Sequence, residues 1–343
     1  MADRHLIFPF AAIAGQEQMK TALLLNIVDP GIGGALIKGE KGTAKSTAVR
    51  SLVQILPDAE RVKGCPYNCD PRPGRGRCPV CAEAAAAGKE LEYERAAMRV
   101  VELPLSATED RIAGTLDIEH VLQTGKKKFE PGVLAQANGN LLYVDEVNLL
   151  DDHMVDLLLD TAAMGVNYVE REGISFQHPS RFILVGSMNP EEGDIRPQLL
   201  DRFGLCVEIR GENDVATRAE IVARRLAFDA DPEGFSGTYA NETEKIKNNV
   251  LSARKILSET KADKELISMA SRVALHFEMD GHRADITMVR AAMANAALNG
   301  RTDAGKEDIA AVAPLVLSHR IKRRPFEESR FDTEELETCL RDL

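Results

Sequence analysis

One stretch of the chain constrains its fold more than any other. A short apolar run at Ala35–Lys38 is followed by a glycine-containing loop at Gly39–Ala44, and then by Lys45–Leu56, which ends before Pro57. The first run predicts a buried strand and the last a helix. A strand, a loop and a helix in this order are typical of phosphate sites, where backbone N–H groups and the start of the helix face the anion.

The loop itself nearly fits the phosphate-loop pattern G-x-x-x-x-G-K-[ST], with Ala44 where the last glycine is expected. Alanine keeps the backbone N–H and is expected to fit the start of a helix, although its methyl group needs room. Lys45 is expected to bridge the β- and γ-phosphates of ATP, and the Ser46 hydroxyl to bind Mg²⁺. The alternative, a chance glycine turn, fits the strand–loop–helix order poorly. The nucleotide-binding candidates are Gly39, Glu40, Lys41, Gly42, Thr43, Ala44, Lys45, Ser46 and Thr47.

Two carboxylates follow an apolar strand candidate at Asn140–Asp145. Asp145 is expected to hold Mg²⁺ through its water shell, and Glu146 to polarise the attacking water. Strands often end in acids, so this pair gains its weight from the phosphate loop that precedes it in the chain.

Three polar residues are candidates with plain alternatives. Asn189 ends the strand candidate at Arg181–Ser187, where its amide could orient water or contact the γ-phosphate, but an Asn-Pro turn is the simpler interpretation. Arg202 lies just before a strand predicted at Leu205–Ile209, and Arg290 lies on a predicted helix. A lone arginine is usually a surface charge or a salt-bridge partner, so neither residue by itself indicates a catalytic role.

The whole pattern predicts an α/β fold, a phosphate-loop core with a parallel central sheet flanked by helices, followed by an all-helical lid. A further strand candidate is Arg99–Leu103, and Gln16 to Ile27 is predicted to be an amphipathic helix with Met19, Leu23 and Ile27 on one face. The other predicted helices are an Ala-rich helix at 82–97, a helix at 151–164, and helices at 213–227, 244–259, 263–278, 285–299 and 306–322. We assign residues 1–210 to the core, with a Cys-rich insertion at 64–81 and a hairpin at 166–178. Residues 211–243 form the connection, with 229–241 as its linker, and 244–343 the lid.

The net charge of −11 argues against a dedicated nucleic-acid binder. The basic runs Lys126–Lys128 and Arg320–Arg324 are interpreted as solvated ends of helices or loops. No apolar run reaches the ~18–20 residues of a membrane helix, and MADRHLIFPF has no export signal, so a cytoplasmic protein without membrane partners is expected.

Taken together, the loop, the acid pair, Asn189, Arg202 and Arg290 resemble the AAA+ ATPases. This resemblance implies that Asn189 is the first sensor and Arg290 the second sensor on the lid. It also implies that Arg202 is a finger that reaches the γ-phosphate held by a neighbouring subunit, so that hydrolysis requires a ring.

Longer strings narrow the resemblance to the small ATPase subunit of magnesium chelatase, subunit I. They are Phe8–Gln16, Val28–Gly34, Leu103–Arg111, Gly114–Glu119, Phe129–Ala135 and Asn189–Gly204. The resemblance implies a homo-oligomeric ring, six being the family's habit, that drives Mg²⁺ insertion into protoporphyrin IX in chlorophyll biosynthesis. It also implies an ATPase-like partner and a large porphyrin-binding partner, the D and H components of the chelatase. Ile13–Gln16 is then expected near the adenine, and the inserts at 105–135 and 166–178 face partners or the pore.

Four cysteines, Cys65, Cys69, Cys78 and Cys81, stand apart from that pattern. Their spacing C-x₃-C-x₈-C-x₂-C suits a structural Zn²⁺ site or an iron–sulfur cluster, and reduced thiols without metal are the alternative. The cluster loosens the link to chlorophyll, because similar subunits serve cobalt insertion. A cobalt-chelatase ATPase and a MoxR-like AAA+ chaperone for metalloenzymes therefore remain alternatives, and a nucleic-acid motor is a third.

Overall fold

The structure is a computed structural model that describes residues 7–72, 74, 76–117, 123, 129–171, 174–321 and 331–341. The chain divides into two compact units. Met1–Ile55 and Gly186–Leu343 form the first unit, and Leu56–Val185 form the second. The first unit thus joins the beginning of the chain to its end, whereas the predicted domain borders follow sequence order and stay a prediction.

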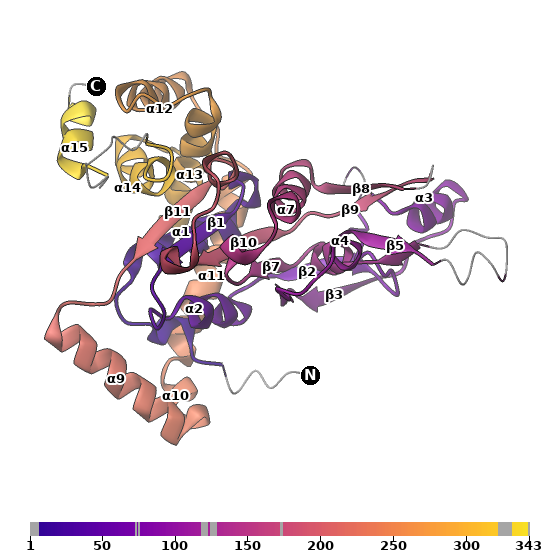
Figure 1. Ribbon diagram of the computed structural model, residues 1–343, viewed down its shortest axis with the longest axis horizontal. Helices are drawn as coiled ribbons and strands as arrows, with labels where there is room; N and C mark the ends of the chain where they lie inside the picture. Colours follow the sequence, from indigo (N-terminus) through magenta and orange to yellow (C-terminus); the bar gives the residue numbers. More distant parts are fainter. Residues whose placement is uncertain are drawn as a thin grey trace. The chain divides into compact units, whose positions relative to one another are not determined.

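A five-stranded sheet forms the centre of the fold, with the strand order β11-β1-β10-β7-β4 (Figure 1). In the first unit β1 pairs with β11 in parallel, from Ala35 opposite Leu205 to Gly39 opposite Ile209. In the second unit β4 pairs with β7 in parallel, from Val100 opposite Leu141 to Leu103 opposite Val144. The strands are β1 Ala35–Gly39, β4 Val100–Leu103, β7 Leu141–Val144, β10 Ile183–Met188 and β11 Leu205–Ile209. The predicted α/β fold class is confirmed.

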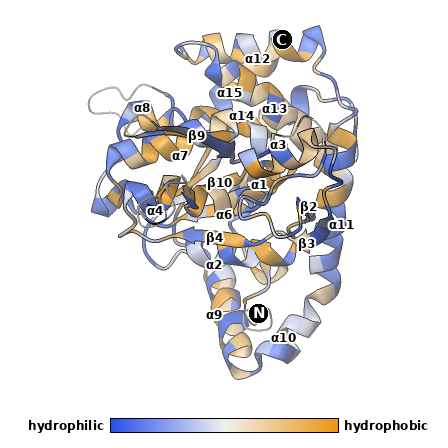
Figure 2. Ribbon diagram, turned by 90° about the vertical axis from the view of Figure 1, so that its right-hand side faces the viewer, coloured by the Kyte–Doolittle hydropathy of each residue, from blue (hydrophilic) through white to orange (hydrophobic). Residues whose placement is uncertain are grey.

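The sheet strands differ in burial. Every residue of β7 and of β10 is buried, as the prediction of strands covered on both faces requires, and β10 is coloured mainly as hydrophobic in Figure 2. The same expectation is wrong for β4, which exposes Glu102. Strand β4 ends the strand order, and an exposed charged side chain at the edge of a sheet disfavours pairing with another chain.

The helix predicted near the start of the first unit is α1 Glu17–Val28, and Met19, Leu23 and Ile27 are fully buried. The helix predicted at Lys45–Leu56 is shorter. It consists of α2 Lys45–Ser51 and a single 3₁₀ turn, η4 Leu52–Gln54. The short helical segments of this unit are η2 Phe10–Ala12, η3 Pro30–Ile32, η6 Pro190–Glu192 and α8 Pro197–Leu200.

The remainder of the first unit is helical, as predicted, and α14 is mainly hydrophobic in Figure 2. One expectation is wrong: residues 229–241 are not an irregular linker, because they contain α10 (Pro232–Thr238). Pro232 begins this helix, and the Asp231 side chain accepts a hydrogen bond from Gly234 N at 2.9 Å, which caps it. The other helices are α9 Val215–Ala230, α11 Ala240–Leu257, α12 Lys264–His276, α13 Arg283–Leu298, α14 Lys306–Leu317 and α15 Thr333–Arg341.

In the second unit the helix predicted at 82–97 is wrong over its second half. Helix α3 (Pro79–Ala86) ends before Gly88, which has a φ of +72°, and residues Tyr93–Ala97 form β3. Strand β3 pairs antiparallel with β2 (Asp58–Val62). Four of the five residues of β3 are exposed, so the strand lacks the apolar alternation by which a sequence reveals strands.

The hairpin predicted at 166–178 is confirmed as β8 Val166–Arg171 paired with β9 Ile174–Pro179. The predicted helix at 151–164 is α7 Asp152–Met164, with Asp151 at its N-cap and a left-handed Gly165 after its end. Further elements of this unit are α4 Glu109–Ala113, β5 Gly114–Leu116, β6 Phe129–Pro131, α6 Val133–Ala137 and η5 Val147–Leu149. Lys126–Lys128 and residues 322–324 of the two basic runs lie outside the described residues. None of the helices in the described part combines the length and hydrophobicity of a membrane span.

Gly204 lies at the closest approach of two turns in the first unit. Its N–H donates to Gly33 O at 3.3 Å, and a Cβ at this position would lie far inside van der Waals contact with Ile32 O. We predict that Gly204→Ala lowers the free energy of unfolding by about 1–3 kcal/mol, because backbone rather than a flexible side chain must move. Chemical denaturation measures this value.

Gly211→Ala is the matched control, since no atom lies within 4 Å of the added Cβ. Its free energy of unfolding should stay within about 0.5 kcal/mol of the parent value. Equal effects of the two substitutions would show that the two turns do not approach as closely as described.

Candidate nucleotide and metal sites

The nucleotide loop lies between β1 and α2 in the first unit. Gly42 has a φ of +82° with open space where a side chain would start, and α2 begins at Lys45. The Lys45 ammonium donates hydrogen bonds to Glu40 O at 2.7 Å and to Gly39 O. The lysine charge is therefore held against the loop, where a phosphate group bound by the loop would meet it.

Ala44 has a φ of +63° and a ψ of +18°, a left-handed conformation. The expectation that it fits a helical start is therefore wrong, because the right-handed helix begins only at the next residue. A left-handed backbone costs a residue with a Cβ about 1–2 kcal/mol. The glycine that the phosphate-loop pattern expects here would avoid this strain.

Asn189 follows β10 in the same unit and is buried. Its Oδ1 accepts a hydrogen bond from Glu191 N at 3.2 Å, so the residue does form the Asn-Pro turn. The neighbouring Glu192 forms an ion pair with Lys41 of the nucleotide loop at 2.5 Å. This hydrogen bond from Lys41 lowers the pKa of Glu192. The pair joins the turn after β10 to the loop after β1.

Arg202 and Arg290 occupy different places in the first unit. Arg202 is half-buried in the turn between α8 and β11. Arg290 is an exposed residue of α13, and its guanidinium donates a hydrogen bond to Gly31 O in the turn η3. Any side chain on Gly31 would collide with this guanidinium.

Asp145 and Glu146 follow β7 and belong to the second unit. The Tyr143 hydroxyl donates to Asp145 Oδ1 at 2.7 Å, which orients the carboxylate. Glu146 has a φ of +52°, which a non-glycine residue rarely adopts outside strained functional positions. Asp145 and Glu146 remain proposed ligands and bases rather than observed ones.

Sequence patterns did not predict the role of Arg320 and its neighbours. Arg320 was expected on a solvated run, but that is wrong: its side chain is only 4% exposed and contacts the segment that contains Arg202. Arg283 at the start of α13 forms an ion pair with Asp201 in the same segment. The only sequence signal for these contacts is the Asp preceding Arg202, which a single chain cannot distinguish from a surface acid.

The four cysteines gather in the second unit. Their Sγ atoms all lie within 4.8 Å of one another, and Cys69, Cys78 and Cys81 are buried. Cys65 Sγ lies 3.8 Å from Cys78 Sγ and 3.5 Å from Cys81 Sγ. The hydrogen bonds from Cys69 and Cys78 lower the pKa of Cys65, whereas burial raises the pKa of Cys81 to about 12. Four sulfurs at these separations can hold a metal ion.

An aromatic cluster packs beside the cysteines. The Tyr67 ring lies 4.9 Å from the His178 ring and 5.9 Å from the Phe176 ring, and Phe176 stacks on Phe129 at 4.1 Å. Burial raises the pKa of Tyr67 to about 12 and lowers the pKa of His178. The cysteine segment is thus attached to β6 and β9 through a hydrophobic core.

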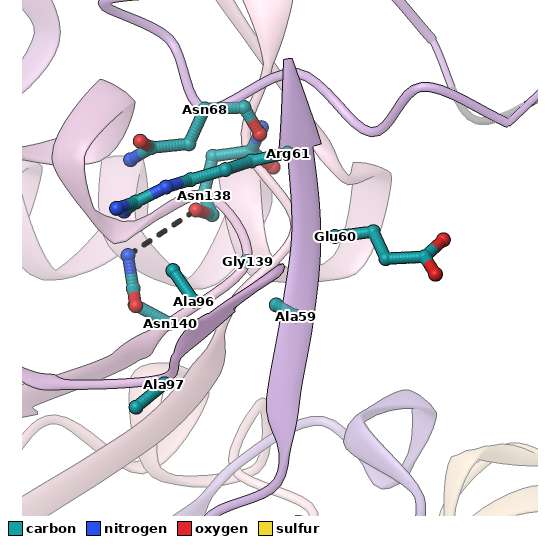
Figure 3. A pocket seen from close by; sticks show the side chains of 9 residues that line it. All are labelled: Ala59, Glu60, Arg61, Asn68, Ala96, Ala97, Asn138, Gly139 and Asn140. Carbon is teal, nitrogen blue, oxygen red and sulfur yellow. Dashed lines mark hydrogen bonds between the residues drawn. The ribbon is translucent and has the colours of Figure 1, made fainter. Parts of the chain in front are cut away.

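A small cavity lies between the cysteine segment and the strands β2 and β3 (Figure 3). Its volume is about 20 Å³, which is room for one water molecule. Figure 3 shows the Arg61 side chain extending over it while Glu60 points away. Asn138 anchors its wall, since the Asn138 amide donates to Tyr67 O at 2.8 Å and to Asn68 O at 3.1 Å. The cavity is too small for an organic ligand.

Comparison with known proteins gives concordant matches. Residues 117–198 match the family model "Magnesium chelatase, subunit ChlI", and residues 267–339 match the AAA lid domain. A magnesium-chelatase subunit ChlI homolog of Methanocaldococcus jannaschii is 51% identical over 343 residues, covering 100% of this chain and 93% of that protein. The chloroplastic subunit ChlI of Glycine max is 51% identical over 94% of this chain and 76% of its own length.

Solved structures agree. The complex of subunits BchI and BchD of magnesium chelatase contains a chain that is 46% identical, with a TM-score of 0.54, over 97% of this chain and 99% of that one. A chain from Cytophaga hutchinsonii has a TM-score of 0.61 at 18% identity, over 97% of this chain and 91% of that one, which shows the fold alone.

The parallel sheet, the nucleotide loop and the helical lid together define an AAA+ ATPase, for which ATP and Mg²⁺ are the implied ligands. Identity over the full length of the chain then decides the family. The chain belongs to the magnesium chelatase subunit ChlI family.

The left-handed Ala44 generates a prediction for stability. We expect Ala44→Gly to raise the free energy of unfolding by roughly 1 kcal/mol, because glycine adopts this conformation without strain. Ala48→Gly, in the right-handed interior of α2, is the matched control and should lower it by about 1 kcal/mol. Thermal denaturation of both variants without nucleotide measures the difference, and destabilisation by Ala44→Gly would contradict the left-handed assignment.

Proposed function

We propose that the chain is the ATP-hydrolysing motor of a chelatase that inserts Mg²⁺ into protoporphyrin IX. The observation that carries this proposal is the 51% identity to a magnesium-chelatase subunit homolog over the whole chain. The intact loop from Gly39 to Ser46 supports it, since a motor of this kind needs a phosphate site.

Each site residue has a role in this proposal. Lys45 neutralises the β- and γ-phosphates, while Ser46 and Asp145 hold Mg²⁺. Glu146 polarises the attacking water, which the Asn189 amide orients.

Two arginines complete the proposed site. Arg202 reaches the γ-phosphate bound by the neighbouring copy in a ring, and Arg290 reports from the lid on the nucleotide of its own subunit. Charge supplied by a neighbour can raise the rate by orders of magnitude, so an isolated subunit should hydrolyse ATP slowly.

The proposed partners are further copies of this chain, a second ATPase-like subunit and a large porphyrin-binding subunit. The solved complex of BchI with BchD supports the second of these, because this chain is 46% identical to a chain of that complex over almost all of its length. The four adjacent thiols suit a reducing compartment such as the cytoplasm.

For the ATPase we predict that Lys45→Ala abolishes hydrolysis, because the substitution removes the ammonium group that the loop carbonyls hold where the β- and γ-phosphates are expected. Lys63→Ala, an exposed residue of the second unit paired with Glu92, is the matched control and should keep the parent rate. Release of phosphate from Mg-ATP measures both. Full activity of Lys45→Ala would refute the assignment of the nucleotide site.

The product of the chelatase is tested by reconstitution with the large and ATPase-like subunits of the same organism. We expect Mg²⁺ to be inserted into protoporphyrin IX only when ATP is present, and the absorbance of the porphyrin measures this insertion. Cobalt insertion into another tetrapyrrole would instead assign the chain to a cobalt chelatase.

We further propose that Cys65, Cys69, Cys78 and Cys81 hold one structural Zn²⁺. Tetrahedral zinc with Zn–S bonds of about 2.3 Å separates its sulfurs by about 3.8 Å, and the two described Sγ pairs lie 3.5 and 3.8 Å apart. A cluster of several irons would spread the thiolates over different atoms, which these short separations do not favour. The metal would stabilise a segment that has little regular structure of its own.

We predict that Cys69→Ser removes the bound metal and lowers the melting temperature by several degrees, because three ligands hold zinc less tightly than four. Cys206→Ala, in β11 of the other unit, is the control and should retain about one zinc per chain. Elemental analysis of the purified protein measures the content. Iron with visible absorbance would contradict the zinc assignment.

A further inference from the structure

We infer that Arg320 is a positioning residue for Arg202 and that it transmits the position of the helical lid to the arginine finger. The inference rests on the proposed function, in which Arg202 acts on the nucleotide of the neighbouring subunit. It adds Arg320 to the residues of the sequence motifs, and it adds a physical connection from the helical lid to Arg202.

The contacts of Arg320 enclose Arg202 on both sides. The Arg320 Nη2 donates to Asp201 O at 3.0 Å and to Phe203 O at 2.7 Å, the carbonyls of the residues before and after Arg202. Its Nη1 donates to Gly204 O at 3.2 Å and to Val316 O in α14. Its Nε donates to Asp201 Oδ1 at 3.0 Å. The Arg320 guanidinium thus links the finger segment (Asp201–Gly204) to the last turn of the lid helix α14.

Two neighbours strengthen the same attachment. His319 Nε2 lies 3.0 Å from Phe203 O, which requires the proton to be on Nε2, and Arg283 pairs with Asp201 from the start of α13. Phe203 is itself buried, and a side chain on Gly186 would meet its ring at 3.3 Å. The lid therefore contacts the residues on both sides of Arg202, and Phe203 also packs near Gly186 of β10.

The burial of the charged Arg320 side chain favours a specific role for its contacts with the finger segment. Arg320 is 4% exposed, and this burial lowers its pKa, so the guanidinium is removed from water. Such a group is tolerated only when its donors are satisfied, as the Asp201 carboxylate and the four carbonyls do here. Lysine would keep the charge but lose the planar set of donors.

Helix α13 connects the proposed second sensor to the finger segment. Arg290, the proposed second sensor, lies on α13 between Arg283 and the end of that helix, so α13 carries both the sensor and one contact to the finger segment. A lid that moves when nucleotide binds would move the carbonyls around Arg202 as well. The nucleotide of one subunit would in this way set the position of the finger offered to the next.

Mixing of inactive variants tests this inference. Lys45→Ala destroys its own nucleotide site but offers an intact finger, and Arg202→Ala does the reverse, so a mixture of the two should recover hydrolysis. Arg320→Met alone should lose about a hundredfold in kcat, as expected for a displaced catalytic group, while its nucleotide affinity stays within a few-fold of the parent value.

In mixtures, Arg320→Met should recover activity with Lys45→Ala and should not recover with Arg202→Ala. The reverse outcome would show that Arg320 serves the nucleotide of its own subunit, and recovery with neither would show a structural role only; both would overturn the inference. Arg283→Gln should behave like Arg320→Met with a smaller loss. Arg225→Met, an exposed arginine of α9, should keep the parent rate.

Two controls keep the result decisive. If Lys45→Ala and Arg202→Ala do not recover activity together, the proposed finger in trans is wrong and the inference falls with it. If Arg320→Met fails to bind nucleotide, Arg320→Lys and Arg283→Gln decide in the same mixtures, and failure of both to recover with Lys45→Ala overturns the inference.

Discussion

The close approach of Gly204 to Ile32 and Gly33 is the constraint on which the first unit depends. It places the turn after α8 against the turn before β1, so that β11 enters the sheet parallel to β1 from Leu205 onward. The same two turns carry Arg202 and the Gly31 carbonyl that receives Arg290. Because Gly204 has no side chain, the two turns can come this close. The contact thus determines where the segment around Arg202 lies, where Arg290 meets the Gly31 carbonyl, and where β1 leads into the nucleotide loop.

Much of this arrangement follows from the sequence alone. The apolar runs that become β1, β7, β10 and β11 are short and nearly continuous, a pattern that is typical of strands buried on both faces. The loop and its lysine follow from backbone requirements that few residue types meet. Local patterns fail where structure depends on distant partners. The exposed strand β3 is held by pairing with β2, and α10 is specified by capping at Asp231 rather than by apolar spacing.

Arg320 illustrates the same limit for functional residues. In the sequence it begins a run of basic residues, and basic runs usually lie in water. In the fold, Arg320 follows the end of α14 and contacts Asp201, Phe203 and Gly204, which lie more than a hundred positions earlier. These residues supply four of the five acceptors that replace water, and Val316 O supplies the fifth. Burial of a charge is a property of the assembled fold, because only the fold supplies the acceptors. The four cysteines are the contrasting case, since their spacing within one short segment already restricts the sulfurs to a small volume.

The segments of the proposed nucleotide site and the finger segment differ in how their backbones are held. Ala44 in the nucleotide loop and Glu146 after β7 both adopt left-handed backbones that cost free energy, and such strain persists only where the surrounding structure fixes it. The finger segment instead has its carbonyls held by donors that are already present. If the finger is rigid relative to the lid, its position changes only when the lid moves. Hydrolysis at the neighbouring site then depends on the state of the lid rather than on the finger itself.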